Sequence, residues 1–386
     1  MALRKLWTRG RDRRLVLGPA LGLAAALATV GCTSLPPGPG AASGRGSTAG
    51  AAAPAITAAQ ARQVWDHYVA AGAEAVKTGN PALALALETG PQRAYDSATD
   101  TAARKTLGTS ASALRQARAG LAPPAYTTPA FSLAEQSGYP RFFVADATRK
   151  LTSDYSSGAA APISVDGAEI HPFGPELMLF EQASAGKPWL LASTSNLAVG
   201  ETLPKLAADN AGYIPTVAPA AGTQLAQPDY VGALQAAVVD DGPANAATKA
   251  VADGPLTTGL YQGAVDHTGD LAAPPGDAYQ WELDGSSYPR FALRTAAGGA
   301  LVFYAMTLTT TVAVPDVINK ANPIHSGPPI QVPADVRPLL PPGRPAPLVQ
   351  LSSDQTLSFA AVDPAPGAAK VQVIAMGGGL TSASAS

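Results

Sequence analysis

A short motif that occurs twice constrains the fold of this chain more than any other feature. Residues 137–142 read SGYPRF and residues 286–291 read SSYPRF, so five of the six positions agree at an offset of 149 residues. A shorter candidate strand precedes each copy, and an apolar, strand-prone run follows it. The repeat predicts a duplicated unit in which Tyr-Pro-Arg-Phe marks the start of a strand.

Further matches extend the repeat in the same order along the chain. Residues 256–259 (LTTG) echo residues 87–90 (LETG). Residues 176–193 and 356–376 both read as a strand, a turn rich in Gly or Pro, a lysine and a second strand. The second copy carries an additional stretch, 315–350, with ten prolines. Because proline blocks strand interiors, we expect this stretch to be an ordered wrap or an exposed arm.

Helical signals precede the strands in each half. Thr57 and Gln60 have the spacing of a capping box, and apolar residues recur at helical spacing over residues 64–76. Gly79 can adopt the left-handed conformation that ends a helix. In the second half, Asp229 is the expected N-cap of a further helix.

Helices followed by antiparallel strands predict an α+β fold. We expect two tandem similar halves, each with helices followed by a curved, mainly antiparallel sheet. The first domain would span residues 55–222, and the second would span residues 223–386 and include the Pro-rich insertion 315–350. This layout resembles the nuclear transport factor 2-like and polyketide-cyclase-like superfamily. The resemblance implies a cone-shaped fold for each half and carries over no functional residue.

The first 31 residues read as an export signal. A basic run precedes the uncharged apolar stretch Leu15–Val30, which is shorter than the about 20 residues of a membrane span and fits a secretory signal. Residues 29–32 (TVGC) then resemble the lipobox of bacterial lipoproteins, although leucine is usual where Thr29 stands. In that family the cysteine receives a diacylglycerol and the chain is cut just before it. The resemblance implies a signal peptide at 1–31, lipid attachment at Cys32 and a place on the outer face of the cell membrane.

Other interpretations of this segment stay open. Cleavage after the small-residue pattern at 26–28 would release a secreted protein, retention of the apolar stretch would leave an uncut anchor, and Cys32 could be a buried thiol. Cys32 is the only cysteine, so no internal disulfide can form. Residues 32–54 have almost no large apolar side chain, which predicts a flexible tether with a mean reach of about 25 Å. The whole layout also resembles uncharacterised secreted lipoproteins of actinobacteria.

Removal of residues 1–31 would leave an acidic chain. Six of the 26 basic residues and one of the 28 acidic residues lie in that segment, which leaves 20 basic and 27 acidic residues and a net charge of about −7. A nucleic-acid-binding protein has the opposite balance. The expected partner is therefore membrane lipid through acylated Cys32, with an envelope protein or a small apolar ligand as further candidates.

The sequence contains no catalytic signature. Ser184 and Lys187 have the S-x-x-K spacing of penicillin-recognising enzymes, but Gly186 and Pro188 predict a hairpin turn there. Three acids could serve acid–base chemistry, but all three are expected on the surface. Asp66 would lie on a helix, Asp146 in a strand and Asp266 in a loop. The histidines are too dispersed for a metal-binding pair, so no metal or cofactor is expected: His67, His171, His267 and His325. Residues 380–386 are expected to fray.

The repeated arginines, Arg141 and Arg290, are the candidate ligand-binding residues, because arginine can clamp a carboxylate through two hydrogen bonds. The alternative is structural: the proline begins a strand, the aromatic residues pack on the core, and the arginine covers their flank. Recurrence of the motif in both halves favours a shared structural role.

The sequence favours a membrane-tethered binding or scaffolding lipoprotein. The alternative is a small-ligand carrier or an enzyme that uses an apolar pocket in one half. A carrier or enzyme requires a closed, mostly apolar cavity with a few convergent polar groups. A scaffold has filled halves and an exposed interaction patch.

Overall fold

The computed structural model describes part of the chain: residues 54–108, 110, 112, 125–150, 163–165, 168–170, 174–270, 278–313, 330–343, 350–367 and 369–386. Side chains are described in these ranges except at 163–165, 168–170, 267–270 and 278. The chain divides into units 1–50 and 51–386, and every described residue belongs to the second unit. The predicted signal segment, Cys32 and the tether as far as residue 53 lie outside the described residues, as do His171 and His325.

The helices begin with α1 (Ala58–Thr78), whose capping box is confirmed: the Thr57 side chain accepts from the Gln60 backbone N–H, and the Gln60 side chain accepts from the Thr57 backbone N–H. Gly79 ends α1 with φ 66°, also as predicted. The remaining helices are α2 (Ala82–Leu85), α3 (Gly90–Leu107), α5 (Val231–Asp241) and α6 (Thr258–Asp270). Short 3-10 turns span Pro228–Tyr230, Ala246–Lys249 and Arg337–Leu339. No helix among the described residues is long and apolar enough to cross a membrane.

The strands of the first half are β1 (Ala125–Tyr126), β2 (Ala130–Glu135), β3 (Arg141–Lys150), β4 (Ile163–Val165), β5 (Ala168–Ile170), β6 (Pro175–Gln182), β7 (Leu190–Leu197) and β8 (Tyr213–Pro215). The strands of the second half are β9 (Ala278–Gly285), β10 (Phe291–Arg294), β11 (Ala300–Ala313), β12 (Gln350–Asp363) and β13 (Gln372–Ala385). All but β4 and β5 join one sheet in the order β10-β11-β12-β13-β7-β6-β3-β2-β8, with β1 added to β3 and β9 added to β11.

This sheet is antiparallel except where β8 pairs with β2, so the α+β prediction is confirmed at that level. The strands of the two predicted halves meet where β13 pairs with β7, with Ala375 opposite Leu197. Thr216, which follows β8, bridges Leu293 of β10. The segment that contains β8 therefore links the two ends of the strand order.

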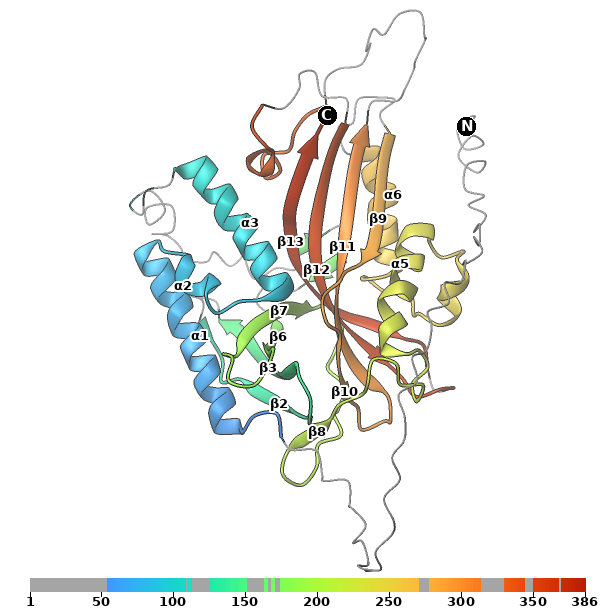
Figure 1. Cartoon of the computed structure of the whole chain (residues 1–386). Helices are drawn as coiled ribbons and strands as arrows, with labels where there is room; N and C mark the ends of the chain where they lie inside the picture. Colours follow the sequence, from blue (N-terminus) through green and yellow to red (C-terminus); the bar gives the residue numbers. More distant parts are fainter. Residues whose placement is uncertain are drawn as a thin grey trace, which may run out of the picture. The chain divides into compact units, whose positions relative to one another are not determined.

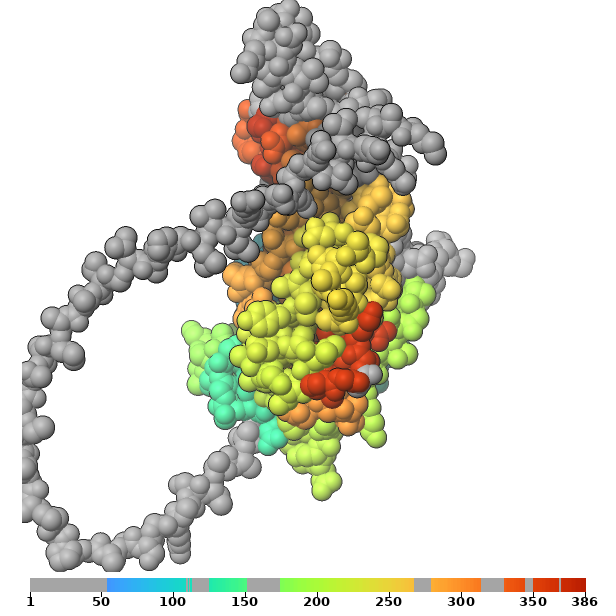
Figure 2. Space-filling model, turned by 90° about the vertical axis from the view of Figure 1, so that its right-hand side faces the viewer, coloured from blue at the N-terminus to red at the C-terminus, as the bar shows by residue number. Residues whose placement is uncertain are grey.

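Helices cover the sheet from two sides (Figure 1). On one side α1 packs against β3 and β6, with Trp65 in a cluster with Phe143 and Phe180. On the other side α5 packs over β11 and β12 through a second cluster that includes Val238 and Phe359. Figure 2 shows the α5 side, where the yellow segment that contains α5 lies beside the red β12–β13 turn.

The two copies of the motif meet inside the fold. β3 begins at Arg141 and β10 begins at Phe291, which confirms the predicted start of a strand. Phe142 and Phe291 are 2% and 8% exposed, and their ring centroids are 4.8 Å apart. They belong to a core cluster that draws on strands from both halves. The surroundings of the copies differ, because β2 and β3 pair with each other whereas β9 and β10 both pair with β11.

The C-terminal segment is not frayed, contrary to the expectation. β13 pairs with β12 as far as Ala385, opposite Leu351, and Ser386 exchanges two 3.0 Å backbone hydrogen bonds with Gln350. Within the Pro-rich insertion, residues 330–343 form an ordered wrap that packs Ile330, Val336 and Leu340 with Leu351, while residues 315–329 and 344–349 lie outside the described ranges. The wrap supplies the apolar contacts that hold the end of the chain in place.

Candidate functional site

A groove of about 470 Å³ lies beside the first turns of α1. The segment before α1, the helix itself, the start of β3 and the β6–β7 connection all contribute to it. Its polar lining comes from Thr57, Gln60, Gln63, Arg141 and Gln182, and its apolar lining comes from Pro54, Ala55, Ile56, Val64 and Trp189. Among the described residues, Arg141 is the only charged one in this lining.

Arg141 is the first residue of β3 and lies opposite Gln182 of β6. The Cζ atom of its guanidinium lies 4.8 Å from the centre of the Tyr139 ring, which is a cation–π contact. Its Nε atom is buried and has no hydrogen-bond partner among the described residues. A buried N–H group left unpaired costs about 1–3 kcal/mol.

Arg290, the second motif arginine, has different surroundings. Its Nη1 atom lies 3.5 Å from Oδ1 of Asp229. Asp229 was expected to cap α5, but the N-cap of α5 is Tyr230, without a side-chain hydrogen bond. The cap prediction is therefore wrong, and the carboxylate pairs with Arg290 instead. Within the described part of the chain, no ion pair involves Arg141.

The other groups around the groove favour negative charge. The N-terminus of α1, with its partial positive charge, adjoins the groove at Thr57. Gln182 Nε2 donates to the Lys187 carbonyl at 2.6 Å, which holds the β6–β7 turn at the rim. The Trp189 ring packs on Phe143, with centroids 5.3 Å apart, and forms a rigid apolar wall. The arrangement can hold a carboxylate or phosphate group.

A second polar cluster is buried beneath α1 and α3. Glu88 is 3% exposed, and its Oε2 atom has no hydrogen-bond partner among the described residues. Burial, together with the charge and hydrogen bond of Asp96, raises the pKa of Glu88 to about 8, and Arg93 opposes that rise. Burial also raises the pKa of Asp96. Gln92 Nε2 donates to Asp96 Oδ2 at 2.6 Å, and Thr194 Oγ1 donates to Gln92 Oε1 at 2.8 Å.

Three further groups complete the buried cluster. Burial raises the pKa of Glu176, while Arg149 and a hydrogen bond from Tyr126 oppose the rise. The pKa values of Tyr126 and Tyr68 are raised, chiefly by burial and further by the neighbouring carboxyls. Sequence reasoning missed this cluster, although the LETG echo at residues 87–90 contained one of its members.

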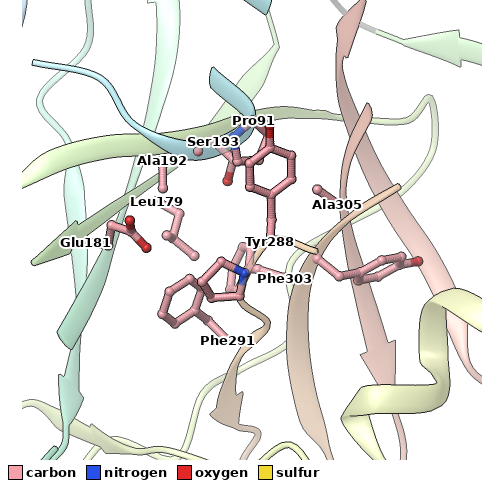
Figure 3. A pocket seen from close by; sticks show the side chains of 12 residues that line it. Pro91, Leu179, Glu181, Ala192, Ser193, Tyr288, Phe291, Phe303 and Ala305 are labelled. Atoms are coloured by element: carbon pink, nitrogen blue, oxygen red, sulfur yellow. The ribbon is translucent and has the colours of Figure 1, made fainter. Parts of the chain in front are cut away.

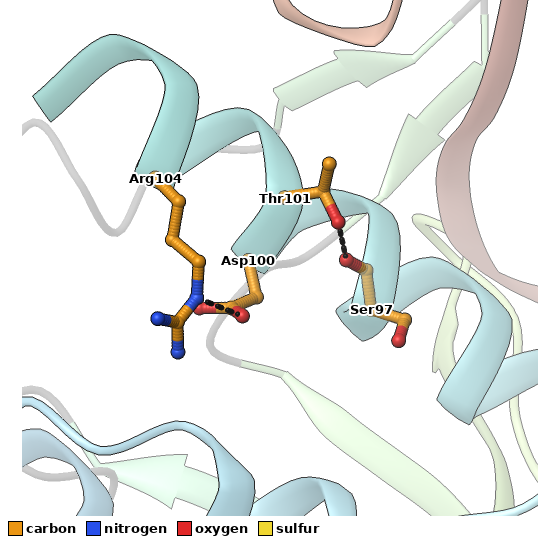
Figure 4. Close-up of polar contacts among 4 residues, drawn as sticks. All are labelled: Ser97, Asp100, Thr101 and Arg104. Atoms are coloured by element: carbon orange, nitrogen blue, oxygen red, sulfur yellow. Dashed lines mark hydrogen bonds and ion pairs between the residues drawn. The ribbon is translucent and has the colours of Figure 1, made fainter. Parts of the chain in front are cut away.

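The polar contacts continue one turn further along α3 (Figure 4). There Arg104 Nε lies 2.7 Å from Asp100 Oδ2, and Thr101 Oγ1 donates to the Ser97 carbonyl at 2.8 Å. Contacts of this kind between residues four apart contribute only about 0.3–0.5 kcal/mol. They support the helix and provide no binding site.

One cavity lies between strands of the two predicted halves. A cavity lined by Glu181, Ser193, Tyr288 and apolar neighbours (Figure 3) has a volume of about 20 Å³, which is room for about one water molecule. A small-molecule site requires about 300–1,000 Å³. This cavity therefore cannot hold the small ligand of the carrier or enzyme interpretation.

The other residues that the sequence singled out belong neither to the groove lining nor to the buried Glu88 cluster. Asp66 and His67 are exposed on α1, as expected, with Asp66 3.7 Å from Arg62. Burial raises the pKa of Asp146, in β3. Asp266 lies on α6, not in a loop, because the helix continues to residue 270.

The Lys187 backbone N–H donates to the Ser184 carbonyl at 3.2 Å, in the predicted hairpin turn. Within the described ranges, no three His, Cys, Asp or Glu side chains are arranged to hold a metal ion.

Comparison with known proteins gives one match. The model of a family described as "Domain of unknown function (DUF8094)" matches residues 52–385. No curated protein and no solved structure matches the chain.

Proposed function

This chain belongs to the family described as a domain of unknown function, DUF8094, and we propose that it is a membrane-tethered extracytoplasmic lipoprotein that binds an acidic partner in the Arg141 groove. The acidic group would be a carboxylate or phosphate. The protein would act by binding, and Cys32 would carry the lipid.

The difference between the two motif arginines carries this proposal. Both stand at the same position of the repeat, yet Arg290 is paired with Asp229, and Arg141 faces a groove whose described lining residues include no carboxylate. A structural arginine needs only the first arrangement. The second arrangement leaves the Arg141 cation without a carboxylate partner among the described residues.

The position of the groove suits a tethered protein. Pro54, the last residue of the predicted tether, forms part of the groove lining. A partner bound there would stay within the reach of the tether from the membrane, about 25 Å on average. The chain beyond residue 31 has a net charge of about −7. An acidic partner would therefore be repelled by most of the surface, and a groove whose described lining holds one cation and no carboxylate would favour its approach.

We also infer that the two halves are similar units. In the strand order β12-β13-β7-β6, the hairpin β12–β13 of one half lies beside the corresponding hairpin β6–β7 of the other half, and the two last strands, β13 and β7, are neighbours. In addition, Phe142 contacts Phe291, its counterpart in the repeat. Contacts between equivalent residues are what a two-fold arrangement produces. The resemblance of each half to the nuclear transport factor 2-like fold stays a prediction.

Titration of the full-length protein in detergent tests the binding site. The probes are inorganic phosphate and a hexaglutamate peptide, and the readout is tryptophan fluorescence, because Trp189 lines the groove. We expect Arg141→Ala to weaken binding at least about tenfold, or about 1.4 kcal/mol, and Arg290→Ala to change it less than about twofold, because its guanidinium is already paired. Equal affinities of the two variants would overturn the proposal.

A further inference from the structure

Glu88 occupies a fixed place at the junction of α3 and the sheet. The Thr89 N–H donates to the Leu191 carbonyl at 2.8 Å, and the Leu191 N–H donates to the Leu87 carbonyl at 2.9 Å. These bonds form a parallel bridge that fastens residues 87–89 beside the start of the strand β7. They hold the Glu88 side chain in the interior, where it is 3% exposed.

The repeat shows that this position does not require an acid. Thr257, the counterpart of Glu88 before α6, is 1% exposed. Its hydroxyl donates to the Ala252 carbonyl at 2.8 Å and lies 3.2 Å from the Gly254 carbonyl. In backbone pairing the place of Glu88 is taken by Val251, which forms a parallel bridge with Val371: the Ala252 N–H donates to the Val371 carbonyl at 2.8 Å, and the Val371 N–H donates to the Ala250 carbonyl at 2.7 Å. The same bridge therefore forms around an apolar side chain. At residue 88 the chain instead buries an ionisable group with one unpartnered oxygen.

Charged and titratable groups surround the Glu88 carboxyl on several elements. Asp96 and Arg93 lie on α3, and the exposed Arg93 donates to the Leu85 carbonyl. Tyr68 on α1 interacts electrostatically with Glu88 and with Glu176 on β6. Tyr126 on β1 interacts in the same way with Glu176 and with Arg149 on β3. With all the carboxyls ionised, three negative charges would share this interior with Arg149 and the rim residue Arg93. A buried like-charge pair holds a proton far more readily than a solvated one.

We propose that Glu88 and Asp96 form a proton-binding site that fastens residues 87–96 to β7, so that loss of their shared proton loosens this segment. The proton sits between the two carboxyls, and its release leaves two buried negative charges that favour opening toward water. The site does not depend on the Arg141 groove.

The direction of the effect follows from the two states of Glu88. Its pKa is about 8 in the folded protein and 4.5 as an isolated group. The folded state therefore binds the proton more tightly. The stabilisation it provides is complete below about pH 4.5 and is lost as the pH rises from there through about 8.

Hydrogen exchange on the full-length protein in detergent tests the site. The protection of the Thr89 and Leu191 amides is measured at pH 5, 7 and 9 and corrected for the intrinsic exchange rate at each pH. In the wild type, we expect this protection to fall at least about tenfold between pH 5 and 9. In Glu88→Gln, which is neutral at every pH, we expect protection that does not change with pH.

Two variants make the test decisive. Asp66→Asn, which replaces an exposed acid on α1 that pairs with Arg62, serves as the control and should keep the wild-type dependence. Asp96→Asn removes a group that raises the pKa of Glu88 and should move the transition to lower pH, which gives a result even if Glu88→Gln fails to fold. Protection in the wild type that is independent of pH, or an unshifted transition in Asp96→Asn, would overturn the proposal.

Discussion

Residues at the same position of the repeat have different neighbours in the two halves. Arg290 is paired with Asp229, which lies 61 residues away in the sequence, whereas no described lining residue of the groove beside Arg141 carries a carboxylate. The shared motif predicts that both arginines stand at the start of a strand. It cannot predict their roles, because each role depends on a partner brought near by the fold.

Buried hydrogen bonds provide a prediction at this scale. The Tyr304 hydroxyl donates to Gln235 Oε1 at 2.8 Å, and Gln235, fully buried, donates to the Leu256 carbonyl at 2.9 Å. Tyr304→Phe leaves a buried amide oxygen unpaired and should lower the free energy of unfolding by about 1–3 kcal/mol. Urea denaturation measures the change. Tyr230→Phe, at a side chain that is 58% exposed, is the control and should change stability by less than about 0.5 kcal/mol.

Among the elements, β13 joins the two halves and shows why glycine is needed there. A Cβ atom on Gly377 would lie 2.2 Å from the Thr194 carbonyl oxygen, and one on Gly378 would lie 2.1 Å from that of Thr356. These glycines let β13 pass between β7 and β12. They lie directly before residues 380–386, which the sequence predicted to fray.

Substitution of one of these glycines tests the role of β13. Gly377→Ala forces backbone to move on the β7 side, and we expect it to lower the free energy of unfolding by about 1–3 kcal/mol. Gly285→Ala, at the end of β9, where an added Cβ meets nothing within 4 Å, should be close to neutral. A thermal melt of each variant measures the difference. Equal melting temperatures for the two variants would contradict this account of the joint.

For the whole molecule, the sequence predicted the class of fold but not that the strands of the two halves would join in one sheet. Local signals in the sequence predicted the α1 capping box, the left-handed Gly79 and both strand starts. The β13–β7 pairing depends on a few residues such as Ala375 and Leu197, and alternation of apolar residues does not specify which strand will be the partner. The buried Glu88 cluster was missed for the same reason, since its members come from five elements.

Binding of an acidic probe to cell membranes tests the central claim most directly. Membranes from cells that produce the protein are incubated with fluorescent hexaglutamate and sedimented, and both protein and probe are measured in the pellet. We predict that the wild type and Arg290→Ala retain protein and probe, that Arg141→Ala retains protein but loses at least about nine-tenths of the probe, and that Cys32→Ala loses both to the supernatant. Retention of as much probe by Arg141→Ala as by Arg290→Ala, or of Cys32→Ala protein in the pellet, would contradict the account.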